Sequence, residues 1–255
     1  MIQIQYISKQ YEQTTALKDL TLEIPAGKIF GFLGHNGAGK STTLKCLTSI
    51  IEPTSGEIFF NDLSLKEHRH EIKKMIGYVP DTPDLFLQLS ANEYWQLIRA
   101  AYEIDSVQVI NHQKELIALF DMNDHVDETL NSFSHGMRQK VIIIGALLAD
   151  PEVWILDEPM QGLDPQAAFD LKALMKQHVE KGKTVIFSTH VLDTAQQLCD
   201  ELAILKKGEL LYNGSVDDLL AQSPNESLET IYLKMAGRLS QEGHLLEDVE
   251  ESHES

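Results

Sequence analysis

One segment near the start of the chain has the residue types and spacing of a phosphate-binding loop. It reads Gly34-His35-Asn36-Gly37-Ala38-Gly39-Lys40-Ser41, which fits G-x-x-x-x-G-K-[ST] at every fixed position. Glycines there allow backbone N–H groups to converge on phosphates, and a following helix directs its positive end towards them. Lys40 is placed to reach the β- and γ-phosphates, and the Ser41 hydroxyl to ligate Mg²⁺. The alternative is a glycine-rich turn with an exposed lysine, but the apolar run before the loop and the helical pattern after it favour phosphate binding.

Two adjacent carboxylates could complete the chemistry. Asp157 and Glu158 come directly after the apolar run 153–156, which predicts a buried strand. A nucleotide loop needs a carboxylate for the Mg²⁺ shell and, for hydrolysis, a base for the attacking water. We predict that Asp157 is the metal ligand, directly or through water, and that Glu158 is the general base. Because acidic strand ends are also common on α/β surfaces, it is the loop in the same chain that favours hydrolysis.

The elements that must position these residues alternate between strand and helix at both ends of the chain. Sequence patterns predict strands over residues 2–8, 20–24, 28–33, 57–60, 75–79, 153–156, 184–188 and 202–205. Helices are expected over residues 40–50 and 192–199, and between Pro165, which suits a first helical turn, and Gly182. This order indicates an α/β fold, with a P-loop NTPase core, a mainly parallel sheet and an N-terminal antiparallel β portion.

The middle of the chain has no convincing strand pattern. Ser90 and Glu93 form a capping box that opens a helix to residue 101, and helices are expected over 106–120 and 134–149. We therefore expect a helical subdomain, about residues 84–149, inserted into a domain that covers residues 1–214. A helical extension over 215–240 follows. The last segment, 241–255, has six acidic residues and no Lys or Arg, which predicts a solvated, disordered tail.

Composition narrows the class of protein. The 255 residues are 43% hydrophobic and 24% charged, as in ordinary globular proteins. The net charge of −18 argues against a nucleic-acid partner, because grip on phosphates usually needs a basic face. Cys46 and Cys199 are expected to be buried and unbridged in a reducing compartment. The N-terminus lacks a signal-peptide core and the longest apolar run, 141–149, is too short to span a membrane, so we expect a soluble, cytoplasmic protein.

Further motifs follow in a fixed order. Ser134-His135-Gly136-Met137-Arg138-Gln139 is similar to the signature Leu-Ser-Gly-Gly-Gln. Gly162-Leu163-Asp164-Pro165 follows the carboxylate pair, and His190 follows the strand pattern 185–189. Together with the phosphate loop, these motifs resemble the nucleotide-binding domain of an ATP-binding-cassette (ABC) transporter over residues 2–214.

The resemblance implies roles for single residues, with ATP and Mg²⁺ as cofactors. Tyr11 matches the aromatic that stacks on adenine, although it could instead pack on the sheet, and Thr42 extends the loop's nucleotide site. Ser134 and Gly136 would bind the γ-phosphate held by a second subunit, which is compatible with Ser134 capping a helix. Residues 162–165 match the loop that crosses the dimer interface. His190 matches the switch histidine that contacts the γ-phosphate and joins Glu158 as a catalytic candidate.

Two positions depart from the family pattern. Asp81 stands where the family usually has Gln. Its carboxylate could still meet Mg²⁺ or its water, but it adds negative charge near the γ-phosphate, and a turn residue within Pro80-Asp81-Thr82-Pro83 is the alternative. His135 replaces the first glycine of the signature, whereas Gly136 is kept; the sequence leaves open whether His135 tunes phosphate contact or is tolerated.

The resemblance implies an ATPase subunit that dimerises on ATP and drives a separate integral membrane permease. Its partners would be a second ABC ATPase subunit and the permease. The subunit would be cytoplasmic and bound to the inner face of the cell membrane through that permease. Family members meet the permease near residues 81–99, where Phe86, Tyr94 and Trp95 are either contact residues or helix-core residues. Residues 227–235 resemble the C-terminal helix of bacterial exporter-type multidrug cassettes, which favours export.

Other classes explain fewer motifs. A soluble ABC ATPase of translation or DNA maintenance is the main alternative. The chromosome type carries long coiled-coil insertions and the translation type two fused cassettes, whereas this chain has one compact helical block and one cassette. A P-loop GTPase or small-molecule kinase would leave the signature and His190 unexplained, and no Asn-Lys-x-Asp motif is present. A regulator that does not hydrolyse ATP is disfavoured by Glu158 and His190.

Overall fold

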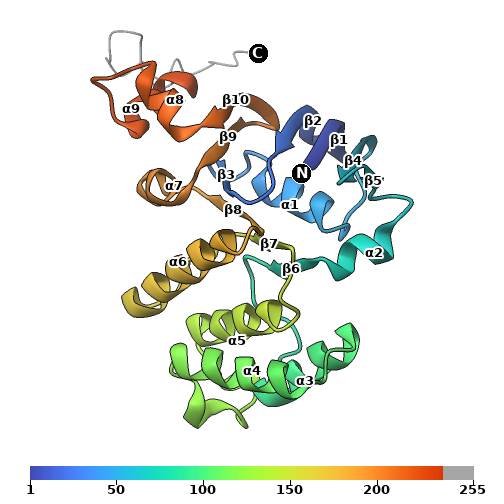
Figure 1. Ribbon diagram of the computed structural model, residues 1–255. Coiled ribbons are helices and arrows are strands. Elements are labelled where there is room, and N and C mark those ends of the chain that lie inside the picture. Colours follow the sequence, from blue (N-terminus) through green and yellow to red (C-terminus); the bar gives the residue numbers. More distant parts are fainter. Residues whose placement is uncertain (238–255) are drawn as a thin grey trace, which may run out of the picture.

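The computed structural model describes residues 1–237, and Figure 1 shows how their elements are arranged. Two sheets lie in the upper part of that view, with the helices of the inserted subdomain below them and the C-terminal helices above. The expected acidic tail, and the last residues of the expected 215–240 extension, lie outside the described residues.

A six-stranded sheet forms the centre of the molecule. Its strand order is β10-β9-β3-β8-β7-β6. The strands are β3 (Ile29–Leu33), β6 (Ile76–Val79), β7 (Val153–Leu156), β8 (Thr184–Thr189), β9 (Glu201–Lys206) and β10 (Glu209–Ser215). All neighbours pair in parallel except β9 and β10, which form an antiparallel hairpin. The mainly parallel sheet predicted from the sequence is therefore confirmed, and the carboxyl ends of β3, β7 and β8 meet at one edge.

A second, antiparallel sheet forms from the N-terminal part of the chain. Its order is β2-β1-β4-β5, with β1 (Ile2–Tyr11), β2 (Thr14–Ile24), β4 (Ser55–Phe60) and β5 (Leu63–Ser64). Helix α1 (Lys40–Leu47) shares one apolar core with this sheet and with one face of the central sheet, through buried residues that include Leu44, Phe30 and Phe32. The alternation of side chains along β3 explains this, because Ile29 and Leu33 belong to the core on the opposite face.

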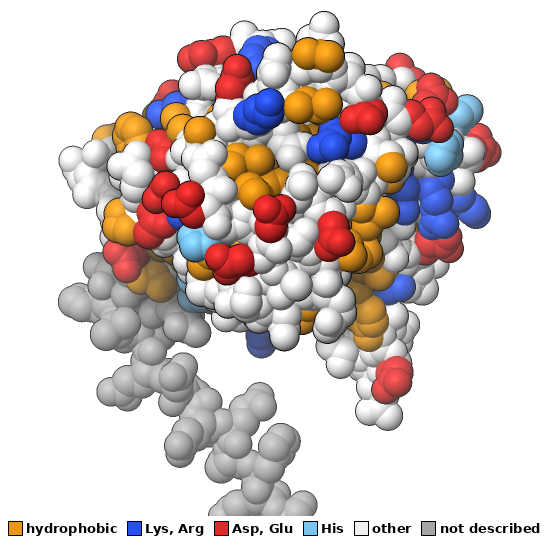
Figure 2. Space-filling view, turned by 90° about the horizontal axis from the view of Figure 1, so that it is seen from below, with side chains coloured by type: hydrophobic (Ala, Val, Ile, Leu, Met, Phe, Trp, Pro, Cys, Tyr) orange, Lys and Arg blue, Asp and Glu red, His pale blue; other side chains and the backbone are white. Residues whose placement is uncertain are grey.

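Helices cover the rest of the central sheet and form the inserted subdomain. The helical subdomain contains α3 (Ala91–Tyr102), α4 (Val107–Leu119) and α5 (His135–Leu147), and α3 begins at the predicted capping box. Tyr94 and Trp95 are buried, 5% and 0% exposed, so helix-core packing is their role in this chain, whereas Phe86 is exposed. Figure 2 views the molecule from the side of this subdomain and shows apolar side chains among charged ones on its surface. The large hydrophobic residues exposed within residues 85–119 are Leu85, Phe86, Leu97, Val107, Ile110 and Leu119.

The remaining helices flank the carboxyl half of the chain. Helix α6 (Pro165–Glu180) begins at Pro165 as predicted, with Asp164 as its cap, and Gly182 follows its end with φ of +81°. The other helices are α2 (Arg69–Lys74), α7 (Leu192–Leu198), α8 (Val216–Ala221) and α9 (Leu228–Met235), with short 3-10 turns at Asn123–His125 and Leu130–Ser132. Helices α8 and α9 form the described part of the C-terminal extension.

Two negative findings hold for residues 1–237. Cys46 and Cys199 are both buried and neither forms a disulfide there, as the sequence predicts. No helix in this part of the chain is long and apolar enough to cross a membrane.

Candidate functional site

The phosphate-binding pattern forms a loop between β3 and α1, at the carboxyl edge of the central sheet. Gly37 and Gly39 have φ of +79° and +107°, a region that only glycine enters without strain. At Gly39 a side chain would also lie 2.8 Å from Leu17 and 2.9 Å from the Ala16 carbonyl oxygen. Lys40 begins α1 and is 5% exposed; its ammonium donates hydrogen bonds to the carbonyl oxygens of Gly34 at 2.6 Å and His35 at 3.3 Å. The carbonyl oxygens of the loop thus hold the ammonium group of Lys40.

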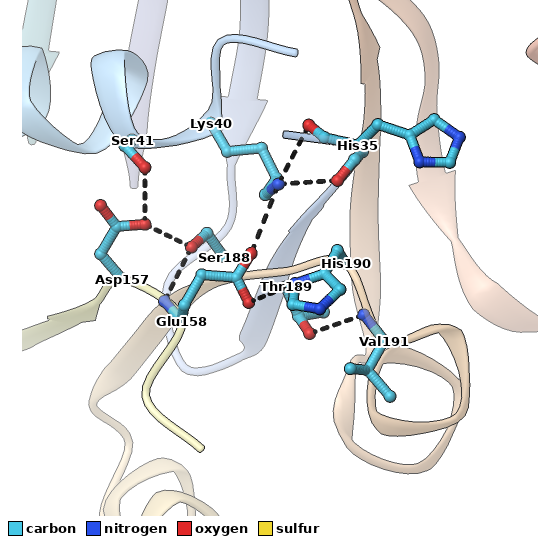
Figure 3. Close-up of polar contacts among 10 residues, drawn as sticks. His35, Lys40, Ser41, Asp157, Glu158, Ser188, Thr189, His190 and Val191 are labelled. Atoms are coloured by element: carbon cyan, nitrogen blue, oxygen red, sulfur yellow. Dashed lines mark hydrogen bonds and ion pairs between the residues drawn. The ribbon is translucent and has the colours of Figure 1, made fainter. Parts of the chain in front are cut away.

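Asp157, at the end of β7, faces Ser41 across the sheet edge (Figure 3). Its Oδ1 accepts hydrogen bonds from Ser41 Oγ at 3.0 Å and from Ser188 Oγ at 2.5 Å. Its Oδ2 is buried and has no hydrogen-bond partner within residues 1–237. Burial raises the pKa of Asp157, the two serine hydrogen bonds oppose this, and the charges of Asp81 and Glu158 add to the rise. A buried carboxylate with one unused oxygen beside a serine hydroxyl fits Mg²⁺, which binds oxygen ligands.

Glu158 lies between two cationic or titratable groups. Its carboxylate forms an ion pair with Lys40 at 3.3 Å, and its other oxygen lies 3.0 Å from Nδ1 of His190 (Figure 3). The Glu158 backbone has φ of +46°, a strained conformation for a residue with a side chain, and its N–H donates to Ser188 Oγ. Such strain persists where the surroundings hold a residue in place, and it directs this side chain into the site.

A cavity of about 360 Å³ joins these groups. It is lined by loop residues 35–42 together with Asp81, Glu158, Gln161 and His190. Asp81 therefore lies where a ligand held by the loop could reach it. Gln161 and Ser188 belong to the site but to none of the motifs recognised in the sequence. A polar residue near the end of the apolar strand β8 was a usable signal for Ser188, whereas nothing in the sequence marked Gln161.

Tyr11 lies apart from this cavity. It ends β1, its side chain is 43% exposed, and the ammonium of Lys9 lies 5.3 Å from its ring centroid. Tyr11 is not one of the described residues that line the 360 Å³ cavity. Its ring is thus partly exposed at the surface, at the end of β1.

Ser134 and Gly136 also lie outside the cavity, at the start of α5. Ser134 is exposed and caps the helix, because its Oγ accepts a hydrogen bond from the backbone N–H of Met137 at 3.3 Å. Gly136 lies against Gly162 of the segment that follows Glu158, and Lys140 pairs with Asp164 of the same segment at 2.9 Å. The signature-like segment and residues 162–164 are thus one connected surface, separate from the phosphate loop of the same chain.

Comparisons with known proteins agree with this architecture. Residues 17–161 match the model of the ABC transporter family. The chain is 32% identical over 219 residues to the ABC transporter ATP-binding protein NatA of Bacillus subtilis (strain 168), covering 86% of this chain and 89% of NatA.

Two solved structures have the same fold. The first, an ATP-binding subunit of an ABC transporter, has a TM-score of 0.86 and 32% identity, covering 92% of this chain and 99% of that one. The second is the dimeric post-hydrolysis state of the ATP-binding cassette MJ0796 bound to ADP and Pi. Its TM-score is 0.77 at 25% identity, and the match covers 85% of this chain and 99% of that one.

Proposed function

Because this chain belongs to the ABC transporter family as an ATP-binding subunit, we propose that it closes head to tail with a second such subunit on two ATP molecules and thereby drives a separate membrane permease. The protein is an ATPase. The observation that carries the proposal is the arrangement of Lys40, Ser41, Glu158 and His190 around one cavity, with Asp157 hydrogen-bonded to Ser41.

Within one subunit, the loop residues 34–42 bind the phosphates of ATP. Lys40 exchanges its contacts with the loop carbonyls for phosphate oxygens, and Ser41 and Asp157 hold Mg²⁺ directly or through water. The bound cation neutralises phosphate charge. Asp81 lies close enough to the same cavity to meet the metal shell, which is the role that the family usually gives to Gln.

Glu158 takes the proton of the attacking water. Its carboxylate is held from two sides by Lys40 and His190, and ATP phosphates would compete for Lys40. The phosphates would draw Lys40 away from Glu158. The Glu158 carboxylate would then be free to accept a hydrogen bond from water, while its contact with His190 keeps the carboxylate in the same orientation. His190 contacts the γ-phosphate in this scheme.

A second subunit supplies the remaining groups. The exposed start of α5 offers the Ser134 hydroxyl, the Gly136 backbone N–H and the positive end of a helix, all of which are suitable anion ligands. Because these groups are separate from the phosphate loop of their own chain, they fit a γ-phosphate on another chain. The dimeric cassette MJ0796, whose fold is similar, supports this arrangement. Tyr11 stacks on the adenine at the surface.

The permease would dock on the segment between β6 and α3 and on the adjoining helical subdomain. Leu85, Phe86 and Leu97 expose apolar surface there, 45%, 51% and 42% respectively. In this proposal the protein works in the cytoplasm, on the inner face of the membrane, where its permease holds it. The resemblance of residues 227–235 to exporter-type cassettes supports export.

A pull-down from solubilised membranes tests the partner. The tagged chain, carrying Glu158→Gln to hold the ATP-bound state, is expected to recover a protein with several membrane spans when ATP is present. A Phe86→Asp variant should lose that partner while it keeps ATP binding. Recovery of ribosomes or DNA in place of a membrane protein would contradict the transporter function.

A further inference from the structure

Helix α9 of the C-terminal extension lies against the phosphate loop. The ring of Tyr232 packs edge-on against the imidazole of His35, with ring centroids 5.2 Å apart and an interplanar angle of 67°. Tyr232 is 4% exposed, whereas His35 is exposed. In Figure 3 the His35 ring points away from Lys40 and Glu158, while its carbonyl oxygen accepts a hydrogen bond from Lys40. His35 therefore faces the nucleotide site with its backbone and the extension with its side chain.

A second connection runs through the turn between β9 and β10. Lys206 donates a hydrogen bond from its ammonium to the carbonyl oxygen of Ala236, just after α9, at 2.7 Å. Two residues along the turn, the N–H of Gly208 donates to the carbonyl oxygen of Ala38 in the loop at 2.9 Å. The end of α9 and the phosphate loop are thus both hydrogen-bonded to residues at this short turn.

Helix α9 of the extension is anchored in the main apolar core of the protein. Leu228 and Ile231 of α9 are 1% and 5% exposed and belong to the main apolar core, and α9 packs on α7, which follows His190. A groove of about 260 Å³ separates the loop from α9 and is lined by residues 35–38, Leu205, Lys206, Lys207, Tyr232 and Ala236. The loop is therefore held at two points while it keeps free space between them.

We propose that Tyr232 is a positioning residue for nucleotide binding, acting through His35 to hold the phosphate loop in the form that receives ATP. The inference rests on the proposed nucleotide role of residues 34–42. An aromatic pair of this geometry changes an equilibrium by about two- to tenfold, so its loss weakens ATP binding by that factor. The turnover rate at saturating ATP stays unchanged, because Tyr232 lies away from Glu158 and the reacting phosphate.

The coupling is reciprocal. If contact with α9 favours the ATP-receiving form of the loop, bound ATP must favour contact with α9 by the same factor. A partner that pulls α9 away would then lower ATP affinity without touching the site. This gives the extension a regulatory role in nucleotide exchange.

A double-mutant cycle tests the proposal. The dissociation constant of a fluorescent ATP analogue is measured for the full chain and for Tyr232→Ala, His35→Ala and the double variant, with kcat and KM for ATP. We expect Tyr232→Ala to raise the dissociation constant and KM about two- to tenfold with kcat unchanged. Glu229→Ala, on the exposed side of the same helix, should match wild type.

The double variant decides how Tyr232 acts. If Tyr232 works through His35, removing both costs no more affinity than removing His35 alone. Additive losses, or wild-type affinity in Tyr232→Ala, would overturn the inference. Lys40→Ala separates this result from the proposed function: if that variant loses ATP while Tyr232→Ala keeps full affinity, the nucleotide site stands and only the role of Tyr232 fails.

Discussion

Gly136 at the start of α5 and Gly162 after β7 are in direct backbone contact. A methyl group on Gly136 would overlap the carbonyl oxygen of Gly162, and one on Gly162 would meet the imidazole of His135. The two glycines thus bring the signature-like segment and the segment after Glu158 together. In the proposed dimer both segments face the partner, so their spacing sets the shape of the surface that closes.

Gly136→Ala should disrupt that surface. The overlap forces the two segments apart, and overpacking of this kind costs about 1–3 kcal/mol. We expect ATP-dependent dimerisation to weaken about tenfold or more, while ATP binding by the monomer changes less than about twofold. Sedimentation velocity with ATP, in a Glu158→Gln background, measures the populations of monomer and dimer. Asn131→Ala, in the exposed turn before α5, is the control, and a Gly136→Ala variant that dimerises like it would contradict the role of this contact.

Glu158→Gln should leave ATP binding intact and nearly stop hydrolysis. The amide keeps the size of the side chain but cannot take a proton from water, and loss of a general base lowers rates by about 10²–10⁴-fold. Phosphate release and fluorescent-nucleotide binding are the two measurements. Glu152→Gln, an exposed acid at the other end of the same strand, should turn over normally. Near-normal turnover in Glu158→Gln would remove Glu158 as the base.

Lys40→Ala should lose nucleotide binding. The ammonium that now bonds to Gly34 and His35 is the group that would meet the phosphates, and no other described lysine lines the 360 Å³ cavity. Isothermal titration with ATP is expected to show affinity reduced by about 100-fold or more, since charge-assisted bonds are each worth about 1.5–3 kcal/mol. Lys45→Ala, one turn further along α1, is the control. Unchanged ATP affinity in Lys40→Ala would count against the loop.

Substitution of Asp81 distinguishes a metal-shell role from a turn role. Loss of a group that orients a metal ligand typically costs about 10–100-fold in metal affinity. If Asp81 serves Mg²⁺, Asp81→Ala raises the Mg²⁺ concentration for half-maximal ATPase activity by such a factor, and Asp81→Gln, the usual family residue, restores it. Activity is measured across a Mg²⁺ titration at saturating ATP. An Asp81→Ala variant with a wild-type Mg²⁺ response would leave Asp81 as a turn residue.

His178 should make the fold less stable in mild acid. The side chain is 5% exposed and packs on Trp154 with ring centroids 5.6 Å apart. Burial, aided by the charge of Lys183 and opposed by that of Asp150, lowers the pKa of His178 to about 4. Below about pH 6.5 the unfolded chain therefore binds a proton that the folded chain does not, so stability falls as pH falls towards 4.

The pH effect on unfolding can be measured directly. Between pH 7 and pH 5 this one group should remove about 2 kcal/mol from the free energy of unfolding. Urea denaturation at both pH values, with wild type and His178→Gln, measures the difference. The variant should lose less stability over that range than wild type, and an equal loss would show that His178 does not titrate in this way.

The sequence predicted most of the central sheet because its strands are continuous apolar runs. Each run from β3 to β9 that enters the buried sheet was found within one or two residues. Strand β10 was not indicated, because its side chains are mostly half-buried and give little periodic contrast. Local signals such as the capping box at Ser90 and Pro165 at a helix start were confirmed, since they depend only on neighbouring residues.

The candidate site, like the fold, has features that local sequence predicts and features that depend on the whole fold. The phosphate loop and the Asp157-Glu158 pair were visible because their chemistry is local in sequence. The structure adds how Glu158 is held, with a left-handed backbone between Lys40 and His190. The contacts between Gly136 and Gly162 and between His35 and Tyr232 could not be predicted, because they join distant segments whose approach depends on the whole fold.

The order of strands has a consequence for synthesis of the chain. Strand β3, which carries the phosphate loop, lies between β8 and β9, and these are made much later. At about 5–20 residues per second, a nascent chain waits roughly ten to thirty seconds between the appearance of β3 and that of its second neighbour. During that time β3 exposes unpaired backbone N–H and C=O groups, on both edges until β8 is made and on one edge until β9 follows. Nascent chains that end before residue 206 should therefore bind chaperones on the ribosome and retain no ATP.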